Sequence, residues 1–212
     1  MTKWIAGLGL AALLMSGTAM AQTLPPNPLG VTMGHVHLNS KDIEANKKIF
    51  VAMGGTAMKN GNFEIVKFPG VIVFLNQGPG APAASGGTVG TVVNHIGFVV
   101  RNVQESMAKW KAAGVPVVPG NNGRQDQAYV NTPDGIRIEI LEDKNMPWPI
   151  RYEHVHFSAP DSEIPKMQGW YAKTFGGYAW TRNNGAVAGK RTAVAKIQKC
   201  CDAAGHRQYD HQ

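Results

Sequence analysis

Apolar and polar residues alternate in three short segments of the chain, which is typical of half-buried β-strands. The segments are Gly34–Asn39 (GHVHLN), Asn94–Val99 (NHIGFV) and Glu153–Ser158 (EHVHFS). Each carries a histidine at its second position, and these histidines, His35, His95 and His154, lie 60 and 59 residues apart. In the first segment Val36 and Leu38 lie on one face of the strand, and His35, His37 and Asn39 lie on the other. Self-similarity at this spacing indicates a repeated structural unit of about sixty residues.

A helix is expected after each strand, because apolar residues then recur at helical spacing. They are Ile43, Phe50 and Met53 in the first repeat, Val103, Met107 and Trp110 in the second, and Ile164, Met167, Trp170 and Phe175 in the third. Asp42 or Ser40 and Asn102 are suitable N-caps, and glycines at 54, 114 and 176 are suitable ends. Three more strands are expected in each of the first two repeats. The Asn60-Gly61 hairpin signal connects two of the strands in the first repeat, and a turn at residues 133–135 connects two in the second.

The pattern therefore predicts two βαβββ modules, at residues 34–76 and 94–142, joined by a Gly-, Pro- and Ala-rich linker at 77–93. The third repeat, 143–181, is expected to be incomplete, because alternation fades after its helix. Residues 182–212 are expected to form a poorly ordered basic tail, with a short functional basic extension as the alternative. The predicted fold class is α+β: two βαβββ modules forming a cupped eight-stranded mixed sheet, plus an incomplete third module.

The first 21 residues have the features of a secretory signal peptide, and residues 22–33 are expected to be a linker. Lys3 is followed by an apolar run from Ile5 to Met15 and by Ala19-Met20-Ala21, a cleavage pattern. The run is too short for a stable membrane anchor. The sequence thus predicts an exported protein, periplasmic or secreted.

The net charge of +7 does not indicate nucleic-acid binding. Lys3 and the basic residues from Arg182 onward carry most of the excess positive charge, so the central modules are nearly balanced and no basic face is expected. The adjacent Cys200 and Cys201 are too close for an ordinary internal disulfide. They are expected to be two thiols in the poorly ordered tail, and the alternative is that they link two chains into an oligomer in an oxidising compartment.

The repeat, together with His95 and the stretch Thr132-Pro-Asp-Gly-Ile-Arg-Ile-Glu-Ile140, resembles the vicinal oxygen chelate superfamily of glyoxalases, extradiol dioxygenases and bleomycin-resistance proteins. The resemblance covers residues 34–142 as a full pair and 153–180 as a fragment. It implies that two modules pack into one cup and hold a divalent metal at their first and last strands.

Strand alternation places His35, His95 and Glu139 on one concave face, and these are the predicted metal ligands. The fourth family position is Phe74, which cannot bind metal. Two histidines and one carboxylate favour non-heme iron(II), with manganese, zinc or nickel as alternatives. His37 competes with His35 as the ligand. Otherwise it is a candidate general base or a polar wall residue.

Weaker candidates lie on the same cup. Tyr129 could donate a hydrogen bond in catalysis, and Asn39 and Arg137 could contact a small-molecule substrate. Three functions remain open: a metal-dependent dioxygenase for a vicinal-oxygen substrate, a glyoxalase-type lyase or isomerase, and a non-catalytic binding protein of the resistance type. Fold resemblance alone does not choose among them.

Overall fold

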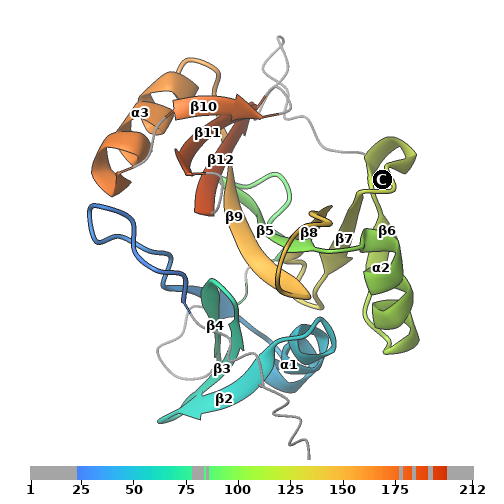
Figure 1. Cartoon of the computed structure of the whole chain (residues 1–212). Coiled ribbons are helices and arrows are strands. Elements are labelled where there is room, and N and C mark those ends of the chain that lie inside the picture. Colours follow the sequence, from blue (N-terminus) through green and yellow to red (C-terminus); the bar gives the residue numbers. More distant parts are fainter. Residues whose placement is uncertain are drawn as a thin grey trace, which may run out of the picture.

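The computed structural model describes residues 23–77, 84, 86–176, 179–182, 185–190 and 193–199 (Figure 1). The predicted signal peptide and the end of the tail, residues 200–212, lie outside the described residues. Within the described part, no helix combines the length and apolar character needed to cross a bilayer.

The chain forms three successive βαβββ modules. The first contains β1 (His35–Asn39), α1 (Ile43–Ala52), β2 (Thr56–Asn60), β3 (Phe63–Phe68) and β4 (Val71–Asn76). The second contains β5 (Val93–Val100), α2 (Val103–Ala112), β6 (Val117–Pro119), a 3-10 turn η1 (Asn121–Gly123), β7 (Gln127–Asn131) and β8 (Arg137–Glu142). The third contains β9 (Ile150–Ala159), α3 (Ile164–Phe175), β10 (Ala179–Arg182), β11 (Gly185–Lys190) and β12 (Ala193–Lys199).

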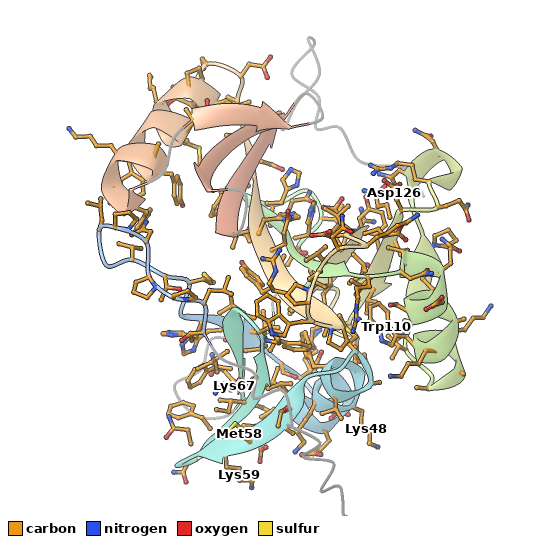
Figure 2. All side chains as sticks on the ribbon, viewed as in Figure 1. Lys48, Met58, Lys59, Lys67, Trp110 and Asp126 are labelled. Carbon is orange, nitrogen blue, oxygen red and sulfur yellow. The ribbon has the colours of Figure 1, made fainter. Side chains whose placement is uncertain are left out.

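Local signals in the sequence account for the helix boundaries. The side chains of Asp42 and Asn102 accept hydrogen bonds from the backbone N–H groups of Ala45 and Glu105, so both cap their helices as predicted. The end of α3 is Gly176 in the left-handed region, at φ 72°. Trp110 of α2 is 3% exposed and packs into the core (Figure 2).

The strands form a four-stranded sheet with order β1-β4-β3-β2 and an eight-stranded mixed sheet with order β10-β11-β12-β9-β5-β8-β7-β6. In every module the first strand runs parallel to the last: β1 with β4, β5 with β8, and β9 with β12. The predicted α+β class and the eight-stranded mixed sheet are confirmed.

The third module is more complete than predicted, because the sequence pattern predicted only a strand and a helix there. Three further strands follow α3, and β12 pairs with β9 in parallel as β8 pairs with β5. Residues 185–199 are rich in alanine and glycine, which carry little apolar bulk. Their alternation is therefore weak, although strand pairing itself needs only backbone groups. Part of the segment expected to be a poorly ordered tail thus belongs to the sheet.

The structure also differs in which modules share the eight-stranded sheet. The second and third modules are joined through antiparallel pairing of β5 with β9, and the first module keeps its own sheet. The first and second modules instead contribute their apolar faces to a common core, where the rings of Phe68 and Phe98 lie 4.9 Å apart. Because side chains alternate along a strand, the opposite faces of these two sheets point away from each other. They cannot line one cup.

Candidate metal centre

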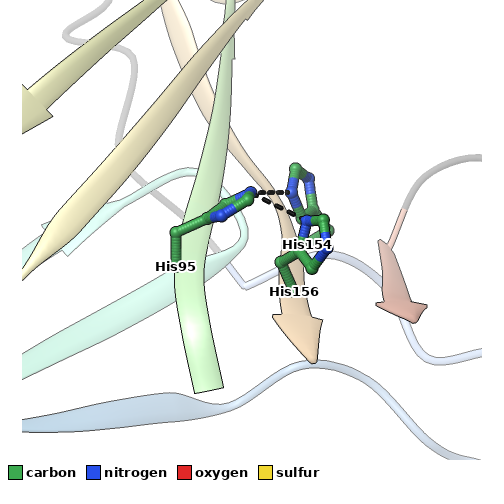
Figure 3. A group of neighbouring side chains, drawn as sticks. All are labelled: His95, His154 and His156. Atoms are coloured by element: carbon green, nitrogen blue, oxygen red, sulfur yellow. Dashed lines mark hydrogen bonds between the residues drawn. The ribbon is translucent and has the colours of Figure 1, made fainter. Parts of the chain in front are cut away.

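Three histidines gather where the first strands of the second and third modules meet. His95 lies on β5, and His154 and His156 lie on β9. In the antiparallel register His95 is opposite His156, Ile96 is opposite Val155, and Gly97 is opposite His154. Because histidines at 95, 154 and 156 project from the face opposite the core, their rings meet across the two strands (Figure 3).

Two imidazoles and one carboxylate form a nearly equilateral triangle. The distances are 3.3 Å between His95 Nε2 and His154 Nε2, 3.3 Å between His95 Nε2 and Glu139 Oε2, and 3.2 Å between His154 Nε2 and Glu139 Oε2. His156 adds Nδ1 at 3.0 Å from His95 Nε2. All four residues are buried, and His154 has no exposed surface.

Gly97 makes room for the His154 ring. A Cβ atom at this position would lie 2.1 Å from His154 Cε1 and 2.3 Å from His154 Nδ1, far inside van der Waals contact. The backbone of β5 therefore supports the ring directly, and this close approach requires glycine. The same position is His37 in the first module and His156 in the third.

Neighbouring polar groups fix which ring nitrogens face the centre. The Asn94 side-chain oxygen lies 2.9 Å from His95 Nδ1, and a Glu153 oxygen contacts His154 Nδ1. Both partners are acceptors, which assigns the proton to Nδ1 in each ring and leaves the Nε2 lone pair facing Glu139. A carboxylate behind a histidine in this way is the usual outer support of a metal-binding imidazole.

Glu139 is held from its other side by Gln127, whose Nε2 donates to Glu139 Oε1 at 2.5 Å. Burial by itself would lower the pKa of His154, but its contacts with Glu139 and Glu153 outweigh burial and raise the pKa above the usual value. The centre thus requires positive charge, from a proton or a cation. Without it, the inward lone pairs of His95 and His154 would face a buried carboxylate.

The donor set fits a divalent transition metal. Imidazole and carboxylate ligands lie about 2.0 to 2.2 Å from zinc. Neighbouring ligand atoms around such an ion are therefore separated by about 3.0 to 3.4 Å in octahedral or tetrahedral geometry. The observed 3.0 to 3.3 Å agrees with this spacing, and the ligand atoms of the three histidines all lie within 4.8 Å of one another. Imidazole and carboxylate suit iron, zinc and nickel.

The structure brings together two of the three predicted ligands, His95 and Glu139. It places His35 in the four-stranded sheet, where the His35 ring contacts His37 and Phe74 at centroid distances of 4.8 and 5.2 Å. His37 and Asn39 lie on the same strand as His35. The reason is the pairing of modules described above, which turns the face bearing His35 away from the face bearing His95.

The remaining candidates lie on the strands beside Glu139. Tyr129 of β7 is paired with Glu139 in the sheet, and the Tyr129 hydroxyl accepts a hydrogen bond from Asn121 at 3.0 Å. Arg137 lies over the Tyr129 ring at 4.9 Å from its centroid. Both residues therefore belong to the sheet that carries the centre, whereas Asn39 does not.

His154 and His156 are the residues that sequence reasoning did not select. His154 occupies the same repeat position as His35, so the spacing alone made the two histidines equally suitable as metal ligands. The weak alternation after α3 suggested an incomplete third module without a cup. One signal in the sequence could have indicated that β5 pairs with β9. Gly97 has no side chain at the position where the other two repeats carry His37 and His156, and it thereby leaves room for the ring of His154.

No family model and no curated protein matches the sequence. Solved structures do match the fold. Glyoxalase I from Zea mays aligns with a TM-score of 0.61 and 18% identity, over 78% of this chain and 66% of that chain. A candidate dioxygenase from Bacillus subtilis aligns with a TM-score of 0.56 and 15% identity, over 79% of this chain and 64% of that chain. The chain spans just under two thirds of the length of both proteins. It therefore has the fold of the vicinal oxygen chelate superfamily, as the resemblance of the sequence implied.

Proposed function

We propose that the protein is a metal-dependent enzyme that acts on a small substrate with two vicinal oxygens, bound at the centre between the second and third modules. The observation that supports this most directly is the triangle of His95 Nε2, His154 Nε2 and Glu139 Oε2, with sides of 3.2 to 3.3 Å. Two histidines and a carboxylate on one face of an ion are the ligand set of non-heme iron(II) oxygenases. We therefore favour a dioxygenase with iron(II).

His95, His154 and Glu139 would hold the metal in this proposal. A metal bound there supplies Lewis-acid polarisation and orientation of substrate oxygens. The chain's own contribution is to fix the ligands through Asn94, Glu153 and Gln127 and to keep water from a centre that is almost fully buried. His156 takes the part first assigned to His37, because it occupies the same repeat position and presents Nδ1 at the centre. It would accept or return a substrate proton there.

A lyase or isomerase with zinc or nickel is the second candidate. It is favoured by the same His156 Nδ1 atom, which at 3.0 Å from His95 Nε2 is close enough to serve as a fourth ligand. A closed set of three imidazoles and one carboxylate would leave fewer positions for dioxygen. The two candidates therefore differ in metal identity and in whether oxygen is consumed.

Metal content and oxygen uptake together test the proposal. Protein carrying His35→Ala and His37→Ala serves as the background, so that the exposed histidines of β1 do not contribute. We expect about one tightly held metal ion per chain in this background, and loss of that ion in His154→Ala and Glu139→Gln. Glu142→Gln is the matched control. It lies on the same strand, but its carboxylate accepts a hydrogen bond from Val103 N at the start of α2.

The outcomes separate the functions. Iron together with oxygen uptake in the presence of catechol-type compounds supports the dioxygenase. Zinc or nickel with conversion of a thiol adduct and no oxygen uptake supports the lyase. Equal metal in Glu139→Gln, His154→Ala and Glu142→Gln would remove the metal centre and leave a buried proton-sharing cluster in a non-catalytic binding protein.

Export is part of the proposal and rests on the N-terminal sequence. The basic residue Lys3, the apolar run and Ala19-Met20-Ala21 support cleavage before Gln22. Expression of the full chain in a bacterium should give a periplasmic protein whose N-terminal residue is Gln22. Full-length protein retained in the cytoplasm would contradict this part.

A further inference from the structure

Arg137 lies on the same face of the eight-stranded sheet as the metal centre. On β8 it is two residues from Glu139, about 7 Å along the strand, and side chains at this spacing point to the same side. On the neighbouring strand β7, Tyr129 pairs with Glu139 and Asn131 pairs with Arg137. Glu139 and Tyr129 are buried, whereas Arg137 and Asn131 are only half-buried. Solvent therefore reaches this face from the Arg137 side of Glu139.

Two contacts hold Arg137 in place on this face. The central carbon of its guanidinium lies 4.9 Å from the centre of the Tyr129 ring, within cation–π range. The Tyr129 ring is fixed in turn by Asn121, which donates to the Tyr129 hydroxyl at 3.0 Å. The backbone N–H of Arg137 donates to Thr88 Oγ1 at 3.0 Å, so the linker before the second module also supports this residue. A guanidinium already held over a ring loses less freedom when it binds an anion.

The charges around the centre favour a negatively charged substrate. Arg151 of β9 is buried within range of the charges of Glu153 and Asp143, two carboxylates that more than offset it. A divalent ion at the centre and Arg137 together bring more positive charge than Glu139 offsets. Taken together, these groups and the ion therefore carry a net positive charge. An anionic group on the substrate would be attracted to this face and would find a hydrogen-bond donor there in Arg137.

We propose that the substrate of this centre carries a carboxylate in addition to its two vicinal oxygens, and that Arg137 binds this carboxylate and thereby selects the substrate. The inference rests on the proposed function, because it places the vicinal oxygens at the metal. Tyr129 lies about 4.8 Å from Glu139 across the strands, and Arg137 about 7 Å along the strand. The guanidinium and the ligand carboxylate are thus separated by about the length of one substituted aromatic ring. A carboxylated catechol fits this spacing.

Two compounds that differ only in the carboxylate test the inference. Catechol and its ring-carboxylated analogue protocatechuate present the same vicinal oxygens. Oxygen uptake by the iron(II)-loaded full chain should show a kcat/KM at least about tenfold higher for protocatechuate. Arg137→Gln should lower the ratio of the two kcat/KM values by about 10- to 100-fold, the range for losing a hydrogen bond between charged groups. Arg137→Lys should restore only part of the ratio, because an ammonium lacks the planar fork that matches a carboxylate.

Arg124→Gln is the matched control. The pKa of Arg124 is raised first by its hydrogen bonds to Asp126 and further by the charge of Glu139, so Arg124 lies within electrostatic range of the centre. Its guanidinium is held by Asp126 through bonds of 2.9 and 2.8 Å. Removing this charge should leave the ratio as in wild type. If Arg124→Gln lowered the ratio as much as Arg137→Gln, general attraction would select the substrate, and the assignment to Arg137 would be overturned. Both rates come from one sample, so the ratio does not depend on how much of a variant folds or holds metal.

Calorimetric titration of zinc-loaded protein with each compound measures binding without turnover and separates this proposal from the proposed function. Protocatechuate should bind at least about tenfold more tightly than catechol, and Arg137→Gln should remove most of this difference. That result without any oxygen uptake would support the carboxylate site and count against the dioxygenase alone. Oxygen uptake with equal kcat/KM for both compounds in wild type would overturn the carboxylate site and leave the proposed function standing. Protocatechuate that bound no more tightly than catechol would also overturn it.

Discussion

Replacing Gly97 with alanine tests whether the backbone of β5 positions a metal ligand. The added Cβ atom would lie 2.1 Å from His154 Cε1, 2.3 Å from His154 Nδ1 and 2.7 Å from His154 Nε2. All three contacts are shorter than any Cβ atom tolerates, so one of the two strands must give way.

The size of the effect follows from these distances. Ordinary contact begins at 3.4 Å, so the His154 ring must move by about 1.3 Å. Metal ligands tolerate about 0.2 Å. The ring is fully buried and is held by Glu153, so it cannot move to another position without losing this contact or its packing. We expect metal binding to weaken by at least about a hundredfold, the upper end of the range for losing a supporting contact. The free energy of unfolding should fall by only about 1 to 3 kcal/mol, as for an overpacked core.

Competition with a chromophoric chelator measures the affinity, and urea unfolding of the metal-free protein measures the stability. Gly169→Ala is the control, because a Cβ at Gly169 on α3 meets nothing within 4 Å. It should leave the affinity unchanged and stabilise the helix by about 0.5 to 1 kcal/mol. If Gly97→Ala bound metal as tightly as wild type, His154 would not be the ligand that the geometry indicates.

Three further predictions concern the support of the centre and the core. Glu153→Gln should weaken metal binding about 10- to 100-fold in the chelator assay without abolishing it, because the His154 ring loses its charged partner; an unchanged affinity would argue against that role. Phe98→Ala should lower the free energy of unfolding by about 3 to 5 kcal/mol in a urea titration, since Phe98 is fully buried against Phe68 and Tyr152; a loss below 1 kcal/mol would count against the shared core. Chelation should lower the melting temperature by about 5 to 10 °C relative to protein with metal at a hundredfold excess over its dissociation constant. Glu139→Gln should show little of this shift.

The repeat made much of the fold predictable. Alternation and helical spacing placed the elements of the first two modules. Asn102 was correctly predicted as a helix cap, and of the two candidates Ser40 and Asp42 the structure selects Asp42, because capping depends on a few neighbouring residues. The inward orientation of His95 and Glu139 also followed from alternation. Strands β11 and β12 were missed, because their small residues give hydrophobic periodicity little amplitude, although backbone pairing remains open to them.

The sequence by itself determined which residues could be ligands, because the repeat gives His35, His95 and His154 the same position on equivalent strands. Only the tertiary structure decided which of them meet. Strand edges of equivalent modules present similar backbone groups, and their choice of partner depends on long-range packing of whole modules. Here the apolar faces of the first two modules share one core around Phe68 and Phe98, which leaves β5 to pair with β9. That choice unites His95 with His154 and leaves His35 on the exposed face of another sheet.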